Sequence, residues 1–455
     1  MKLPHAVVMM MLIIGATAFL TWIIPSGQFE RLPTGPVVPG SYHSVPKERS
    51  LSVFLVPRKS TGEIAYPAGP AAAASAIPAG MVKVAALITM IFFIGGMFGV
   101  LTESGALESG VERLLTATRG NVVLVATAFM IVLAAGSSFL GLISEYLVVI
   151  PIALVVAERL GKSALFGTAM VTIAAKIGYL TSVTNPLALA VAQPIVGVPV
   201  LSGAGFRAVT FVTFLPVGIW YLLRRSRSDV LVAASAPDRT SRLSARHVMV
   251  LSALALSVVV MLVGVQRLAW ESQELAAMYI ALAAAIAVVG GMSSREASQA
   301  FIKGMQGMVL AALLVGLAST VEIILRNSMI LDTVIASLTR SVEGRSPVIV
   351  ANLMMFIQMV IDVFIPSTSG KAAVTMPILG PIGQLAGVSG QVSVQAFLFG
   401  NGLMNTLTPT SGMLLAYLAT GKVTYGEWIR FVAPLALVLL AMCSAALTIA
   451  VLIGL

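Results

Sequence analysis

The sequence has little charge and few of the residues that hold metals or disulfides. One cysteine, Cys443, and three histidines occur among 455 residues, and charged residues make up only 10% of the chain. A single cysteine cannot form an intrachain disulfide, and no histidine or cysteine spacing matches a metal motif. These shortages exclude a disulfide-stabilised secreted protein and a cysteine-based metal site. We expect no cofactor, with Na⁺ as the one candidate coupling ion.

Apolar sequence is what the chain has in abundance. Hydrophobic residues make up 58% of it, and the mean hydropathy is +0.99, which is typical of proteins that lie mostly in a lipid bilayer. The net charge of +10 does not indicate nucleic-acid binding, because the basic residues are scattered between apolar runs. The sequence has no HExxH, paired-aspartate or nucleophile-elbow motif, so we do not expect an enzyme.

Seven apolar windows are long enough to cross about 30 Å of hydrocarbon. They lie at residues 6–25, 81–102, 204–223, 247–266, 275–292, 305–326 and 429–454. Four further apolar stretches are interrupted by short polar segments containing Gly or Pro, at residues 121–160, 164–196, 347–386 and 390–421. The first window resembles a signal peptide, but no cleavage motif follows it, so we expect a retained span.

The interruptions come in pairs. The break at residues 141–145 aligns with the break at residues 366–371, so that Glu145 corresponds to Lys371. Paired breaks at corresponding positions of two halves are typical of secondary transporters built from repeats. One extra span, at residues 247–266, turns the second half upside down. The sequence predicts an all-α polytopic membrane protein of inverted repeats, each with a re-entrant hairpin and a broken transmembrane helix.

This repeat divides the chain into five segments. They are scaffold spans with an external segment at 26–80 (1–120), a hairpin, broken helix and closing helix (121–223), a cytoplasmic linker and extra span (224–266), scaffold spans (267–346), and a second hairpin, broken helix and closing helix (347–455). Two amphipathic stretches, 103–119 and 327–344, are expected along the membrane surface. The positive-inside rule places the amino terminus in the cytoplasm of a bacterial inner membrane.

Breaks at membrane depth indicate a cavity, because unpaired backbone groups in lipid are costly. Half-helix amino termini offer N–H groups to an anion, and hydroxyl and carbonyl oxygens can bind Na⁺. We therefore predict a substrate site from residues at the breaks: Ser137, Ser138, Ser144, Glu145, Lys176, Thr184, Asn185, Ser367, Thr368, Ser369, Gly370, Lys371, Asn401, Asn405, Thr408, Thr410 and Ser411. The candidate Na⁺ ligands are Ser138, Thr184, Asn185, Ser369 and Thr410. The alternative is that these small residues only let helices pack closely.

Ionisable residues inside spans are costly to bury and mark functional sites. Two interpretations of Lys371 and Lys176 are open: attraction of a substrate carboxylate, or a buried charge pair with Asp362 or Glu145. Asp362 and Glu145 are also candidates for proton coupling. Arg207 falls near the end of a span, where we expect a structural residue that extends toward the interface.

Several motifs resemble the YfcC/DcuC carrier family of the ion transporter superfamily. They are Thr184-Asn185-Pro186, Gly203-Ala204-Gly205-Phe206-Arg207, Phe364-Ile365-Pro366-Ser367 with Ser369-Gly370, and Pro409-Thr410-Ser411-Gly412. The resemblance covers nearly the whole chain. It implies inverted repeats with two re-entrant hairpins, a homodimer and an elevator motion. The substrates it implies are C4-dicarboxylates, other small carboxylates or basic amino acids.

The chain departs from the family pattern at several candidate positions. The family usually has Gln at Lys371, a small residue at Lys176, Asp at Asn401 and a second Glu at Ser144, so four changes make the cavity more positive. Asp362, where the family tends to have Asn, has the opposite effect. We therefore expect a small carboxylate as substrate, coupled to Na⁺ or H⁺ or moved by exchange. An antiporter of amino acids such as arginine or ornithine is the alternative.

Overall fold

The structure, a computed structural model, describes residues 5–31, 37–38, 40–50, 52–225, 244–342 and 344–455. Most of the predicted linker between the halves therefore lies outside the described residues. Ten helical segments within the described ranges are long and apolar enough to cross a membrane. The predicted all-α polytopic membrane protein is confirmed.

The first half of the chain runs from α1 to α10. Its elements are α1 (Ala6–Ile23), β1 (Ser26–Gln28), β2 (His43–Val45), α2 (Ser52–Leu55), α3 (Pro70–Lys83), α4 (Ala85–Glu103), α5 (Ala106–Ala117), α6 (Val122–Leu140), the 3-10 helix η1 (Ser144–Leu147), α7 (Val149–Arg159), α8 (Ala164–Thr181), α9 (Pro186–Ile195) and α10 (Ala204–Arg225). The additional span is α11 (Ala245–Arg267).

The second half repeats this order from α12 to α20. Its elements are α12 (Ser272–Gly290), α13 (Ser294–Gln306), α14 (Val309–Asn327), α15 (Leu331–Thr339), the 3-10 helix η2 (Arg340–Val342), α16 (Pro347–Phe364), α17 (Thr368–Leu385), α18 (Gly390–Met404), α19 (Gly412–Thr420) and α20 (Tyr425–Leu452). Helices α3 to α10 thus have counterparts in α13 to α20, and α12 is the counterpart of α1. Each predicted break coincides with the end of one helix and the start of the next, and the break at residues 366–371 extends into the first turn of α17.

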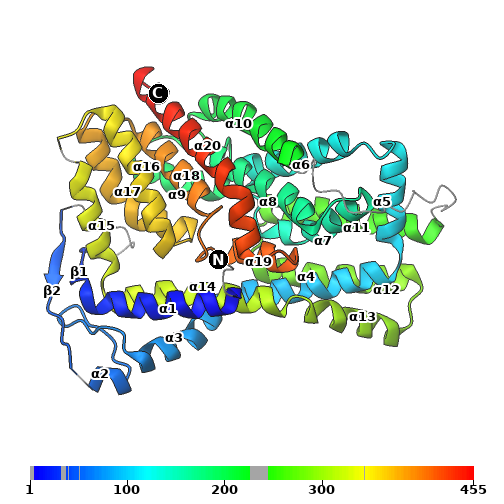
Figure 1. Ribbon diagram of the computed structural model, residues 1–455, viewed down its shortest axis with the longest axis horizontal. Helices are drawn as coiled ribbons and strands as arrows, with labels where there is room; N and C mark the ends of the chain where they lie inside the picture. The colour runs from blue at the N-terminus through cyan, green and yellow to red at the C-terminus, as the bar shows by residue number, and fades with distance from the viewer. Residues whose placement is uncertain (1–4, 32–36, 39, 51, 226–243, 343) are drawn as a thin grey trace.

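The packing of the two halves is reciprocal. α3 packs on α14, and α13 packs on α4; α1 likewise contacts α14, and α12 contacts α4. In Figure 1 these helices lie along the lower part of the molecule, with the hairpins and broken helices above them. The second piece of each broken helix contacts the hairpin of the other half, α9 on α17 and α19 on α7. The two halves are therefore interleaved rather than side by side.

Glycine allows the closest of these helix contacts. A Cβ on Gly304 of α13 would lie 2.1 Å from the Gly95 carbonyl oxygen of α4, and a Cβ on Gly80 of α3 would lie 2.7 Å from the Gly316 carbonyl oxygen of α14. Small residues let helix backbones approach in this way inside membranes. The same type of contact therefore joins α13 to α4 and α3 to α14.

Local capping explains where the broken helices end. Ser182 ends α8 in the left-handed conformation, and Asn185 then caps α9 by accepting from the N–H groups of Leu187 and Ala188. Pro186 stands at the first helical position, where its missing N–H costs nothing. Short-range chemistry alone is thus sufficient to break this span, which is why the break could be predicted.

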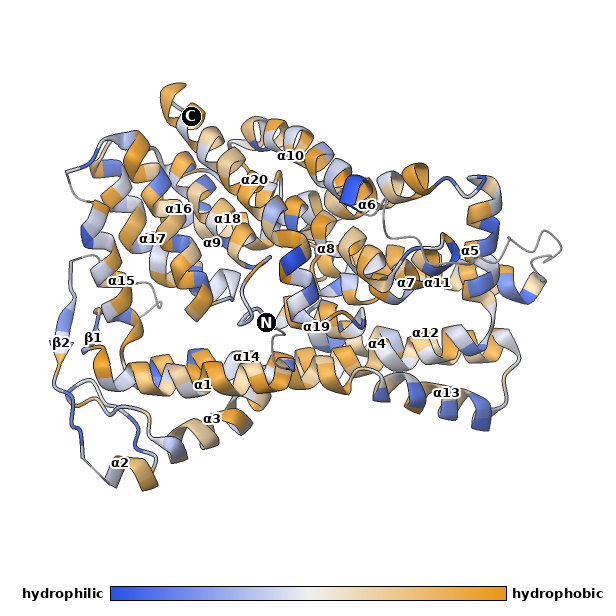
Figure 2. Cartoon of the chain, viewed as in Figure 1, coloured by the Kyte–Doolittle hydropathy of each residue, from blue (hydrophilic) through white to orange (hydrophobic). Residues whose placement is uncertain are grey.

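Three helices were not predicted. For segment 26–80 the sequence predicts only an external location, yet it contains α2 and most of α3, and the window that begins at residue 305 is preceded by the separate helix α13. Figure 2 shows hydrophilic residues along α13 and mostly hydrophobic ones along α1 and α14. α13 begins with a capping box between Ser293 and Glu296 and buries only Ala300. Its mixed polarity and short length kept it below the threshold of a span.

Segment 26–80, which is predicted to be external, is attached to the second half near α15. Ser26 Oγ donates to the Ser328 carbonyl at 2.7 Å, and the Arg31 guanidinium lies 3.0 Å from the Asp332 carboxylate. β1 and β2 pair antiparallel in the same region. The segment is therefore a folded part of the protein that joins the beginning of the first half to the second.

Candidate functional site

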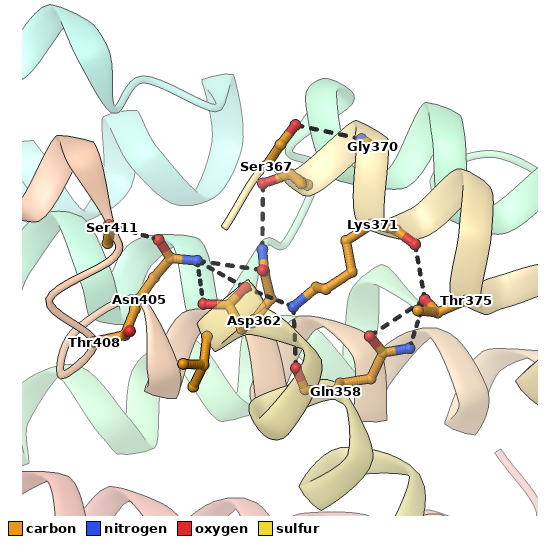
Figure 3. A network of polar contacts seen from close by, with 12 residues as sticks. Gln358, Asp362, Ser367, Gly370, Lys371, Thr375, Asn405, Thr408 and Ser411 are labelled. Carbon is orange, nitrogen blue, oxygen red and sulfur yellow. Dashed lines mark hydrogen bonds and ion pairs between the residues drawn. The ribbon is translucent and has the colours of Figure 1, made fainter. Parts of the chain in front are cut away.

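The second hairpin brings two of the predicted charged residues into contact. α16 and α17 are its two arms, and Asp362 on the first faces Lys371 on the second (Figure 3). Lys371 Nζ lies 2.7 Å from Asp362 Oδ1, and both side chains are 0% exposed. The same ammonium donates to the Gln358 carbonyl oxygen at 3.3 Å. Of the two interpretations of Lys371, the structure shows the charge pair, and its partner is Asp362 rather than Glu145.

The break between α18 and α19 supplies another partner of Asp362. Asn405 Nδ2 donates to both carboxylate oxygens, at 2.8 and 3.1 Å, and Asn405 Oδ1 accepts from Ser411 Oγ at 2.8 Å. Ser411 also caps α19 through the N–H of Leu414. A buried carboxylate is tolerated when a cation and hydrogen-bond donors surround it in this way. Four predicted residues, Asp362, Lys371, Asn405 and Ser411, thus form one network.

A tyrosine of the first half joins this network. Tyr179 Oη lies 2.6 Å from Thr368 Oγ1 and forms a short hydrogen bond with Asn401 Nδ2. Asn401 Nδ2 reaches Thr368 Oγ1 at 3.2 Å, and Asn401 Oδ1 accepts from Asn405 Nδ2 at 3.3 Å. Tyr179 was not predicted, because an aromatic residue in an apolar span usually belongs to the core. The only available signal is its position three residues before Ser182, where the helix breaks.

Lys176 is a buried lysine without a direct partner. Its side chain is 5% exposed, and its ammonium makes no hydrogen bond or ion pair within the described residues. It lines a small cavity of about 10 Å³ with apolar residues of α8, α18 and α20, among them Leu180, Leu403 and Leu435. Gly402 and Thr406 of the same cavity belong to the segment that carries Asn401 and Asn405, so Lys176 lies behind the network around Asp362. We call this network together with Lys176 the polar centre; within the described residues it contains two lysines, Lys176 and Lys371, and one carboxylate, that of Asp362.

The corresponding break of the first half is closed by its own hydroxyl groups. Ser138 Oγ lies 3.0 Å from Thr181 Oγ1 and accepts from the Val183 N–H at 3.0 Å. The Thr184 hydroxyl donates to the Phe139 carbonyl at 3.0 Å. These bonds tie the end of α6 to the gap between α8 and α9. In the described structure these hydroxyl groups hold helices together, and their roles in binding substrate or Na⁺ stay predictions.

Other predicted residues also join helices to one another. Ser137 Oγ donates to the Ala175 carbonyl at 2.8 Å, from α6 to α8. Thr410 Oγ1 lies 2.7 Å from Thr408 Oγ1 and donates to the Val363 carbonyl at 2.7 Å, from the second break to α16. These hydroxyl groups are occupied by protein acceptors.

The tip of the second hairpin keeps polar groups at its surface. Ser367 and Ser369 are exposed, and Ser367 Oγ caps α17 by accepting from the Gly370 N–H at 3.4 Å. The Ser369 hydroxyl makes no hydrogen bond to any residue that the structure describes. The candidate Na⁺ ligands thus lie at three places. Ser138, Thr184 and Asn185 lie at the break between α8 and α9, Thr410 lies at the break between α18 and α19, and Ser369 lies at this tip.

Glu145 lies apart from the network, although the repeat aligns it with Lys371. Its carboxylate accepts from the Ile143 N–H at 2.9 Å and from Ser144 Oγ at 3.1 Å, and so folds back on the tip of the first hairpin. It borders an otherwise apolar cavity of about 400 Å³ between that hairpin and helices α11 and α12, near Tyr279. Ser144 and Glu145 do not meet the other predicted residues in the described structure.

Arg207 has a structural role of a kind that differs from the prediction. Its side chain is 2% exposed and donates to the carbonyls of Val183, Leu201 and Ser202 at 3.2, 3.2 and 2.8 Å. The predicted extension toward the interface is wrong. The loop that follows α9 folds back over the break between α8 and α9 and presents its carbonyls to the guanidinium. The buried arginine therefore links this loop to the break by hydrogen bonds.

A model of the C4-dicarboxylate anaerobic carrier family, DcuC, matches residues 3–452. The chain belongs to the DcuC family. It is 28% identical to the Escherichia coli (strain K12) protein named "Putative basic amino acid antiporter YfcC", over 99% of this chain and 97% of that protein. An uncharacterised protein of Haemophilus influenzae is 25% identical, over 95% of this chain and 94% of that protein. The resemblance stated from the motifs is confirmed, and this DcuC-family chain is a multi-span membrane transporter.

Two solved structures are similar along nearly their whole lengths. The YdaH transporter of Alcanivorax borkumensis has a TM-score of 0.46 and 16% identity, covering 99% of each chain. MtrF of Neisseria gonorrhoeae, described as illuminating a class of antimetabolite efflux pumps, has a TM-score of 0.45 and 17% identity, covering 98% of this chain and 95% of that one.

Proposed function

We propose that this DcuC-family transporter is a secondary active carrier of small carboxylates, such as a C4-dicarboxylate or a short-chain organic acid, in the bacterial inner membrane. The observation that carries the proposal is an excess of buried positive charge: Lys176 and Lys371 are both buried, and among the described residues Asp362 is the one carboxylate that pairs with either of them, through Lys371. An unbalanced buried charge is costly. A substrate carboxylate supplies the missing negative charge, whereas a cationic substrate increases the imbalance.

The substrate carboxylate is placed at the amino terminus of α17. The positive end of this long helix, with its free N–H groups, favours an anion. Ser367 and Ser369 are exposed there, and Thr368 is partly exposed beside Asn401. Lys371 follows in the first turn of the helix. The tip therefore offers hydroxyl and N–H donors at the surface and positive charge beneath them.

The transport mechanism in this proposal is an elevator. The repeats are inverted, the amino terminus is cytoplasmic, and a homodimer holds the scaffold in place. The interleaved packing supports this arrangement, since each hairpin contacts the broken helix of the other half. Helices α1, α3, α4 and α12 to α14 pack on one another, while α14 also packs on α19 and α12 on α11. Coupling is to Na⁺ or H⁺, or by exchange, with Asp362 and Glu145 as the proton candidates.

The second candidate function is an antiporter of basic amino acids, which the printed name of the relative YfcC favours. Counterflow in proteoliposomes distinguishes the two candidates. Vesicles loaded with unlabelled succinate or arginine are given the same compound in labelled form, and accumulation is measured. We expect exchange of succinate, or of another small carboxylate in the same panel, and none of arginine. Exchange of arginine without any carboxylate contradicts the proposal.

Lys176→Met tests the charge argument directly. The substitution removes the ammonium and keeps a flexible side chain of similar length, so we expect carboxylate counterflow to fall at least tenfold with the protein still folded. Ile177→Met, one position along the same helix and lining the same cavity, is the matched control and should transport normally. Equal transport by Lys176→Met and the control would remove Lys176 from the mechanism.

A further inference from the structure

The Lys371 ammonium lies in a place that favours a cation for three separate reasons. Asp362 Oδ1 is 2.7 Å away and the Gln358 carbonyl oxygen 3.3 Å. Asp362 belongs to the last turn of α16, where the helix carboxyl terminus carries negative partial charge, and Gln358 belongs to the turn before it. The Phe397 ring lies with its centre 5.5 Å from Nζ, so its face adds further attraction. A positive charge is therefore stabilised here whatever group carries it.

These ligands are of the kind that bind an alkali cation. Carboxylate and main-chain carbonyl oxygens suit hard cations, and carbonyls at the ends of interrupted helices bind Na⁺ in carriers. Lys371 does not come from α16 itself. It reaches across from α17, the other arm of the hairpin, and places its ammonium among these oxygens. The oxygen ligands and the charge that balances them thus come from separate elements.

We propose that the second hairpin contains a site for a monovalent cation, and that the Lys371 ammonium occupies it as a cation tethered to the protein. When the lysine is removed, the same site binds Na⁺. With Lys371 in place, the charge at this site travels with the protein in every cycle, and no Na⁺ is bound or released there. The statement that no Na⁺ is carried at this site rests on the proposed carrier function and deepens it. The existence of the cation site does not depend on that function.

The two halves differ in this respect. The position aligned with Lys371 is Glu145, whose carboxylate is bonded to the Ile143 N–H and the Ser144 hydroxyl of its own hairpin tip. None of its hydrogen bonds comes from an ammonium within the described part of the chain. The tethered cation is therefore a feature of the second hairpin alone.

The test is thermal unfolding of the purified full-length protein in NaCl against choline chloride, with no substrate present. For Lys371→Ala we expect a saturable rise in Tm in NaCl, about 2 °C or more above the response of the wild type. The rise should disappear in Lys371→Ala/Asp362→Asn, which lacks the anionic ligand. Lys83→Ala is the matched control, because Lys83 also lies 2.7 Å from a carboxylate, that of Glu322. Lys83 is 40% exposed, however, and Glu322 keeps Arg326 as a partner, so this variant should respond to Na⁺ as the wild type does.

Three results overturn the proposal. One is a folded Lys371→Ala protein with the Na⁺ response of the wild type, and another is an undiminished response in the double variant. Lys371→Gln, whose amide oxygen can act as an additional ligand, is measured in parallel and should gain the same response. If both single variants stay unfolded in both salts, the proposal also fails, because bound Na⁺ is expected to restore the charge balance. These Tm responses to Na⁺ are measured without substrate, so they do not depend on whether the protein transports carboxylates. The cation-site proposal and the carrier proposal can therefore be refuted independently.

Discussion

Lys371 and Asp362 form an ion pair of 2.7 Å that joins the two arms of the second hairpin, with neither side chain exposed. The attraction between them must offset the cost of removing two charges from water. Asn405 and the Gln358 carbonyl contribute by satisfying the remaining hydrogen-bonding positions. The pair is therefore costly to break from one side only.

Removing one member of the pair should destabilise the protein more than removing both. We expect Asp362→Asn to cost about 3–5 kcal/mol, because it leaves Lys371 buried without its counter-charge. Asp362→Asn/Lys371→Met should lie closer to the wild type than either single variant, since no unpaired charge remains. Thermal unfolding in detergent with choline as the only cation measures all three. Additive effects of the two substitutions would show that the pair is not coupled in this way.

The Tyr179 hydroxyl should matter for transport more than for folding. Tyr179→Phe removes the hydrogen bonds to Thr368 and Asn401 but keeps the ring, at a cost of about 1 kcal/mol in stability. Because Thr368 is then less firmly held at the hairpin tip, we expect a several-fold rise in the apparent KM for the carboxylate. Tyr279→Phe is the control, since its buried hydroxyl donates to Met261 Sδ at 3.7 Å and to no other residue that the structure describes. An equal KM for the two variants would argue against a role of Tyr179 at the site.

The glycine contact between α4 and α13 should not tolerate a methyl group. In Gly304→Ala the new Cβ would lie 2.1 Å from the Gly95 carbonyl oxygen, so two backbones must separate, and we expect a loss of about 1–3 kcal/mol. Gly205→Ala in α10 is the control, because a Cβ there meets nothing within 4 Å and alanine favours a helix. Thermal unfolding should rank the control at or above the wild type. A neutral Gly304→Ala would mean that the two helices can move apart freely.

Cysteine labelling checks the proposed orientation. Cys443 is fully buried, so Cys443→Ser provides a background with no thiol. In it we introduce one cysteine, at exposed Lys59 in the external segment or at exposed Lys303 of α13. A membrane-impermeant maleimide should label Lys59→Cys in intact cells and Lys303→Cys only after permeabilisation. The opposite pattern would place the amino terminus outside.

The helices and their breaks could be predicted because they depend on neighbours in the chain. Hydropathy runs of the length of a span, Asn185 with Pro186, and Ser411 with Gly412 act within a few residues. Helix α13 was missed because it is amphipathic, and α3 because the sequence predicts only a location for segment 26–80. Both are stabilised by packing against helices of the other half, which no local pattern reports.

The site could be predicted as a set of residues but not as a set of contacts. The repeat alignment treats Glu145 and Lys371 as equivalent, yet the first bonds to its own hairpin tip and the second crosses to Asp362. Tyr179 enters the network only because α8 lies against α18 and the tip of α17. Side chains at aligned positions of the two halves therefore have different hydrogen-bond and ion-pair partners, which the alignment alone does not show.

The sequence by itself determined a bilayer-embedded carrier with two interrupted hairpins and an excess of buried positive charge, since hydropathy, capping and residue type are properties of the chain. The tertiary structure alone decided that Lys371 pairs with Asp362, that Lys176 has no direct partner among the described residues, and that Arg207 binds the carbonyls around the break between α8 and α9. These outcomes depend on which helices interleave. Attraction between charges falls off with distance in space and takes no account of separation along the chain.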